Sequence, residues 1–169
     1  MRRVPANRGM NCRYGEMRVS LPQTQTLYFE DLSVGMREDY VKHVRSSDVV
    51  GFAEISGDRN PIHLSEHFAA KTPFGGRIAH GLYTASLISA VIGTRLPGPG
   101  AIYISQTLRF LAPVRIGDDV VASVEVSELV EKGSRANLTC QCRVGETLVL
   151  EGEAVVKIPR RPAPDATPI

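Results

Sequence analysis

The sequence IAHGLYTASLISAVIGT, residues 78–94, decides the fold of this chain. Drawn as a helix, it is apolar on nearly every face, and a helix of that kind is buried on most of its sides. The segment contains His80, Ser86 and Ser89 and falls short of the about 20 apolar residues that cross a bilayer. It therefore predicts a central core helix that ends at LPGPG, residues 96–100, and no membrane partner.

Four segments after this helix alternate apolar and polar residues, as strands with one buried face do. Their connections, PVRIGD, EKGS and VGET, are short, which favours an antiparallel meander. We expect an α+β fold in which the apolar face of the sheet wraps around the helix. The residues expected on that face are Ile102, Ile104, Leu108 and Phe110, then Val120, Ala122, Val124 and Val126, then Ala136, Leu138, Cys140, Cys142 and Val144, and last Leu148, Leu150, Ala154, Val156 and Ile158.

The pattern predicts one folded domain at residues 27–158. Residues 1–26 lack a regular apolar pattern and are expected to form a poorly ordered tail, and the Pro-rich residues 159–169 a second tail. A sheet of this kind leaves open edges, which a second copy of the chain could cover by edge-to-edge pairing. We therefore expect a homodimer.

Shorter elements are predicted before the central helix. Residues 37–45 alternate weakly, as a strand would. Ser47 is expected to cap a short helix that runs through Ile55 and ends at Gly57. Ser65 is expected to cap a second short helix at residues 66–71.

Composition excludes several classes of function. The net charge of +2, the 6% aromatic content and the absence of Trp argue against nucleic-acid binding as the main role. The three cysteines include Cys140 and Cys142 on one strand face, which favours small buried residues in a reducing compartment over a disulfide or a metal site. No signal peptide is visible, so a cytoplasmic location is expected.

A polar segment precedes the central helix: FAEISGDRNPIHLSEHFA, residues 52–69. It places Asp58, Asn60 and His63 within six positions, in a stretch too rich in Gly, Asn and Pro for a helix or strand. A carboxylate and an imidazole can hold one water between them and exchange its protons. The spacing alone fits an Asx turn better, in which Asp58 and Asn60 bond local backbone N–H groups and His63 is exposed.

The start of the central helix offers a second group of candidate residues. The first turn of a helix has unpaired N–H groups, and Gly81 would let a ligand oxygen approach them closely. Taken alone, His80 and Gly81 are more simply a packed side chain and a close helix–sheet contact. Ser89 lies two turns further along the helix, where it could reach the Asp58 loop or bond a backbone carbonyl one turn earlier.

Together these motifs resemble the MaoC-like dehydratase family, and most closely its short, single-domain (R)-specific enoyl-CoA hydratases. The resemblance rests on Phe52, SGD at 56–58, NP at 60–61 and His63, on His80-Gly81, and on YISQTLRFLAPVRIGDDV at 103–120. It implies a hot-dog fold, a homodimer, an acyl-CoA substrate, and no metal or redox cofactor. It overturns the preference for a simple turn at Asp58 and His63.

By the same resemblance, Asp58 and His63 are the catalytic pair, and the Gly81 N–H binds the thioester oxygen. Asn60, Ser89 and His80 are supporting residues. The implied reaction is the reversible hydration of trans-2-enoyl-CoA to (R)-3-hydroxyacyl-CoA. The alternatives are a (3R)-hydroxyacyl-carrier-protein dehydratase, which would use the same residues, an acyl-CoA thioesterase on the same fold, and a non-catalytic acyl-binding module.

Overall fold

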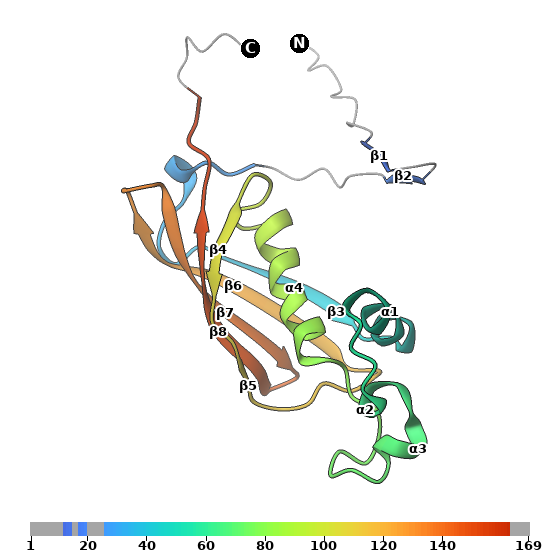
Figure 1. The fold of residues 1–169 in the computed structure, drawn as a ribbon. Coiled ribbons are helices and arrows are strands. Elements are labelled where there is room, and N and C mark those ends of the chain that lie inside the picture. The colour runs from blue at the N-terminus through green and yellow to red at the C-terminus, as the bar shows by residue number, and fades with distance from the viewer. Residues whose placement is uncertain (1–11, 15–16, 20–25, 163–169) are drawn as a thin grey trace, which may run out of the picture.

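Helix α4 (Gly81–Thr94) lies across one face of an antiparallel sheet, as the apolar segment predicts (Figure 1). The computed structural model describes residues 12–14, 17–19 and 26–162. The helix is buried along the side that faces the sheet, through Tyr83, Thr84, Leu87, Ile88, Val91 and Ile92. The strand order is β3-β6-β7-β8-β4, and β5 also pairs with β8. Their bounds are β3 Arg37–His43, β4 Ile102–Gln106, β5 Arg109–Phe110, β6 Asp119–Val130, β7 Arg135–Val144 and β8 Thr147–Lys157.

The apolar faces of β6, β7 and β8 make most of the core beneath the helix, which confirms the period-two pattern except at the start of β8, where Val149 is buried in place of Leu148. Cys140 and Cys142 are fully buried free thiols on this face. Burial raises the pKa of Cys140 to about 11 and that of Cys142 to about 12, as expected of thiols that pack as small apolar groups. The fully buried strand residues are Val120, Ala122, Val124, Val126, Ala136, Leu138, Cys140, Cys142, Leu150, Ala154 and Val156.

The prediction for the first strand of the meander, residues 102–110, is wrong in two respects. It lies beside β8 at the far edge of the sheet, not beside β6, and it is broken into β4 and β5. The break lies opposite Gly152, where an added Cβ would come within 1.9 Å of the Thr107 carbonyl oxygen. Ile102, Ile104 and Phe110 are consequently exposed in the single chain, at 61%, 49% and 53%.

The segment between β5 and β6 crosses the sheet under the start of α4, so its short length does not make the two strands neighbours. The Ala79 N–H donates to the Val114 carbonyl at 2.8 Å, and Ile78 forms a β-bridge with Arg115. These bonds fix the entry of α4 next to the crossing segment.

Three short helices precede α4: α1 (Ser46–Ser56), α2 (Pro61–Leu64) and α3 (Glu66–Ala69). The predicted cap at Ser47 is wrong, because the N-cap of α1 is Arg45, two residues earlier, whose N–H donates to the Asp48 carboxylate at 2.8 Å. Gly57 ends α1 in the left-handed region, at φ 78°, as predicted. The Ser65 cap is also confirmed, although α3 is shorter than expected.

The ends of the chain are described only in part. Strands β1 (Cys12–Tyr14) and β2 (Met17–Val19) pair with one another, and the rest of the predicted tail up to residue 25 lies outside the described residues. A 3-10 turn, η1, covers Phe29–Asp31. Arg160 forms an ion pair with Glu30 at 3.3 Å, and residues 163–169 lie outside the described part. No helix in the described part is long and apolar enough to cross a membrane.

Candidate active site

A cavity of about 620 Å³ opens beside the first turn of α4. It collects residues from the end of α1, the Asp58 loop, α2, the start of α4 and the segment after β4. The polar side chains in its lining are Ser56, Asp58, His63, His80 and Thr84. The rest of the lining is apolar and includes Phe52, Phe74, Leu82, Phe110, Leu111, Pro113 and Val149, with Gly81 at the helix start.

The Asp58 loop is held by its own side chains. The Asp58 N–H donates to Ser56 Oγ at 3.2 Å, and Asp58 Oδ1 accepts the Asn60 N–H at 3.1 Å. Asn60 Oδ1 in turn accepts the Ile62 N–H at 3.2 Å and so caps α2. The Asx-turn bonds are therefore present, yet Asp58 also lines the cavity, and its second carboxylate oxygen has no hydrogen-bond partner among residues 26–162. The same loop therefore forms the Asx turn and supplies Asp58 to the candidate site.

His63 is 9% exposed and is held at one ring nitrogen. Its Nδ1 lies 2.9 Å from the Ile78 carbonyl oxygen, and because a carbonyl only accepts, Nδ1 carries the hydrogen. Nε2 therefore keeps its lone pair in the neutral ring. Arg77 Nε also donates to the His63 carbonyl at 2.6 Å and fixes the backbone of this residue.

The pKa of His63 is lowered, chiefly because burial disfavours the charged ring. The hydrogen bond to Ile78 opposes that shift, a charge on His80 adds to it, and the Asp58 carboxylate opposes it. The balance favours a neutral imidazole that can accept a proton at Nε2.

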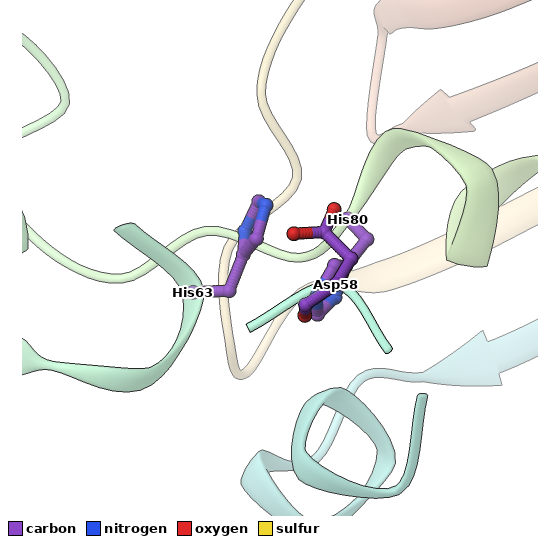
Figure 2. Close-up of side chains that lie close together, drawn as sticks. All are labelled: Asp58, His63 and His80. Atoms are coloured by element: carbon purple, nitrogen blue, oxygen red, sulfur yellow. The ribbon is translucent and has the colours of Figure 1, made fainter. Parts of the chain in front are cut away.

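His80 joins the two predicted catalytic residues. Its Nε2 donates to the Asp58 carbonyl at 3.0 Å, and its ring lies against that of His63, with the centroids 3.8 Å apart. Phe52 contacts it as well, at a centroid distance of 5.0 Å. His80 is 2% exposed, and within residues 26–162 its Nδ1 is buried without a hydrogen-bond partner. Figure 2 shows the Asp58 carboxylate pointing toward the His63 ring, with His80 beside it.

Asp58, His63 and His80 offer ligand atoms within 4.8 Å of one another, a spacing that also occurs in metal sites. One nitrogen of each ring already bonds a backbone carbonyl, that of Ile78 for His63 and that of Asp58 for His80.

Gly81 is the first residue of α4, where backbone N–H groups have no partner within the helix. The ring of Phe110 lies directly over it: a Cβ added at Gly81 would be 2.8 Å from Phe110 Cε1. The absence of a side chain thus lets an aromatic ring and the cavity both reach the helix start.

The structure brings together Asp58, His63, His80 and Gly81, with Asn60 in the same loop. Ser89 is exposed on α4 and is not part of the cavity lining, so the single chain does not bring it to this site. Phe110 is a site residue that sequence reasoning missed. Its alternation with Ile102 and Ile104 assigned it to the core, and no local signal marks the break before it.

Three comparisons with known proteins agree. The MaoC like domain model matches residues 31–150. A 3-hydroxybutyryl-CoA dehydratase of Methylorubrum extorquens is 68% identical over 145 residues, covering 86% of this chain and 92% of that protein. An (R)-specific enoyl-CoA hydratase of Rhodospirillum rubrum is 49% identical over 134 residues, covering 79% of this chain and 93% of that protein.

A solved structure supports the fold independently. The unliganded R-hydratase PhaJ1 of Pseudomonas aeruginosa superposes with a TM-score of 0.78 at 40% identity, covering 86% of this chain and 97% of that one. The match confirms the hot-dog arrangement of a sheet around α4.

Proposed function

This chain belongs to the MaoC-like family, and we propose that it adds water reversibly to trans-2-enoyl-CoA and gives (R)-3-hydroxyacyl-CoA. The enzyme is a hydro-lyase of the enoyl-CoA hydratase and 3-hydroxyacyl-CoA dehydratase type. The roles proposed for individual residues rest on one observation. A single cavity contains a free carboxylate oxygen of Asp58, the imidazole lone pair of His63 and the helix start at Gly81.

Asp58 and His63 are proposed to hold the reacting water between them. His63 Nδ1 is committed to the Ile78 carbonyl, so only Nε2 can exchange a proton with that water. Asp58 Oδ1 is committed to the Asn60 N–H, which leaves Oδ2 for the same water. Two groups with fixed orientation reduce the entropy cost of placing the nucleophile.

The Gly81 N–H is proposed to bind the thioester oxygen. As the water oxygen bonds to the β-carbon, the electron pair of the double bond moves toward the thioester, and negative charge develops on its oxygen. An N–H at a helix start stabilises such charge through the hydrogen bond and the helix dipole. The α-carbon then receives a proton from the Asp58–His63–water system, which balances the addition.

The supporting residues act through the catalytic pair. Asn60 caps α2 and so fixes the helix that presents His63. His80 bonds the Asp58 carbonyl and stacks on His63, so it sets the spacing between the two. Ser89 stays a prediction for the supporting group; from its exposed position it would need a surface brought by a partner to take part.

The test is hydration of crotonyl-CoA, followed by loss of the enoyl-thioester absorbance, with the stereochemistry of the product determined. Asp58→Asn and His63→Gln should each lose at least about 100-fold in kcat while remaining folded. His67→Gln, at an exposed position on α3, is the matched control and should retain wild-type activity. Near-wild-type rates in both active-site variants would refute the residue assignment, and faster turnover of carrier-protein thioesters would refute the CoA assignment.

The homodimer is proposed on the exposed edge of the sheet. Ile102, Tyr103 and Ile104 on edge strand β4 are 61%, 39% and 49% exposed, an apolar row that a second copy would cover. Sedimentation should give twice the mass of the chain, and Ile104→Lys should halve it. A monomeric wild-type protein would refute this part without affecting the reaction.

A further inference from the structure

We propose that Phe110 is a specificity-determining residue that restricts substitution at the α-carbon of the acyl group, so that straight-chain 2-enoyl thioesters are preferred over α-branched ones. The proposal rests on the proposed function and on the contact between Phe110 and Gly81.

The position of the ring is the first observation. Three atoms of the Phe110 ring lie 2.8–3.3 Å from the place that a Cβ of Gly81 would occupy. A thioester oxygen bound to the Gly81 N–H would lie about 2.9 Å from that nitrogen, with the carbonyl carbon and the α-carbon next along the substrate. The ring therefore borders the space where the α-carbon and its substituents must fit.

The ring is also held in place from outside the cavity. Phe110 pairs with Leu150 in the β5–β8 ladder, and its neighbour Arg109 pairs with Glu151 both in the ladder and as an ion pair of 2.9 Å. The strand reaches this position because it breaks at Thr107, opposite Gly152. A wall carried by a strand resists displacement more than a wall carried by a mobile loop does.

The exposure of Phe110 distinguishes a role in substrate specificity from a role in packing the core. More than half of its surface, 53%, is exposed in the single chain, although it lines the cavity. Truncation of the ring should therefore widen the cavity mouth without removing a core side chain. One additional methyl group excluded by an apolar wall typically changes kcat/KM by about 10-fold or more.

The experiment measures kcat/KM for crotonyl-CoA and for its 2-methyl analogue in the wild type, Phe110→Ala and Phe110→Leu. The ratio of branched to straight-chain values should rise about 10-fold in Phe110→Ala and less in Phe110→Leu. Phe68→Ala is the matched control, because Phe68 is an exposed phenylalanine on α3 outside the cavity lining. Its ratio should stay at the wild-type value.

The outcomes distinguish this inference from the proposed function. A wild type that hydrates no enoyl-CoA would overturn the reaction itself. An active wild type whose ratio stays within twofold in both Phe110 variants would overturn the role of Phe110 alone. Phe110→Leu keeps an apolar side chain of similar reach, so it provides the measurement if the alanine variant does not fold.

Discussion

Replacing Gly152 with alanine should destabilise the protein severely, because the strand opposite leaves no space for a methyl group. The added Cβ would lie 1.9 Å from the Thr107 carbonyl oxygen, and real Cβ contacts essentially never fall under 3.0 Å. Backbone cannot rotate away as a side chain does, so the Thr107 segment must withdraw from β8. Two hydrogen bonds depend on the present position: Thr107 N–H to the Glu153 carbonyl at 2.8 Å, and Glu153 N–H to Thr107 Oγ1 at 3.0 Å.

The expected loss follows from these contacts. Each hydrogen bond contributes about 1 kcal/mol, and forcing a group into packed structure costs about 1–3 kcal/mol, so the free energy of unfolding should fall by about 3–5 kcal/mol. For a domain of this size that corresponds to a drop of about 10 °C in Tm. The variant should also have an altered ratio of kcat/KM for α-branched and straight-chain substrates, because the displaced segment carries Phe110 to the cavity.

Urea denaturation followed by circular dichroism measures the change in the free energy of unfolding. Gly51→Ala is the matched control, because Gly51 lies inside α1 with nothing within 4 Å of the added Cβ. It should gain about 0.5–1 kcal/mol from the better helix propensity of alanine. A Gly152→Ala protein within about 1 kcal/mol of the wild type would show that the strand break does not depend on this contact.

Three further predictions concern the site and the core. Because the pKa of His63 is lowered, the acidic limb of the kcat/KM profile against pH should have its midpoint below pH 6.5, and a midpoint above 6.5 would contradict the burial argument. The stability that this residue contributes should be complete above pH 6.5 and should decline as the pH falls toward the folded-state pKa. Asn60→Ala should cost about 1 kcal/mol in urea denaturation through loss of the α2 cap, whereas Asn60→Asp, which keeps the acceptor, should cost less. In a Cys12→Ser protein, Cys140 and Cys142 should react with a thiol reagent at pH 8 only after unfolding, and rapid reaction of the native protein would contradict their burial.

The sequence predicts α4 and the β6–β8 meander well because their patterns are local and their faces are buried. It fails at Phe110, since the alternation from Ile102 continues through the break at Thr107. The break lies opposite Gly152, which is distant in sequence and leaves no space for a side chain beside the Thr107 carbonyl, a contact that no local pattern records. Strand neighbours are equally non-local, so the short PVRIGD connection does not make β5 and β6 neighbours.

The candidate site also combines features that the sequence predicts with features that depend on contacts between distant segments. Asp58, His63 and Gly81 could be identified as site residues only through the family resemblance, because their spacing alone favours an Asx turn and a packed helix start. The bond from His63 to the Ile78 carbonyl and the stacking on His80 could not, since they depend on how α2 meets the start of α4. The bond to the Ile78 carbonyl determines which nitrogen of His63 carries the hydrogen.

The two residues before His80 link the site to the rest of the fold. The Ile78 carbonyl accepts the His63 ring hydrogen, while the next residue, Ala79, is 5% exposed and donates its N–H to Val114. The orientation of the imidazole is thus tied to a backbone bond that forms only when the crossing segment has reached the sheet. The geometry of the candidate site belongs to the same cooperative unit as the core, so a partly unfolded chain that retained the Asp58 loop alone would have no oriented imidazole.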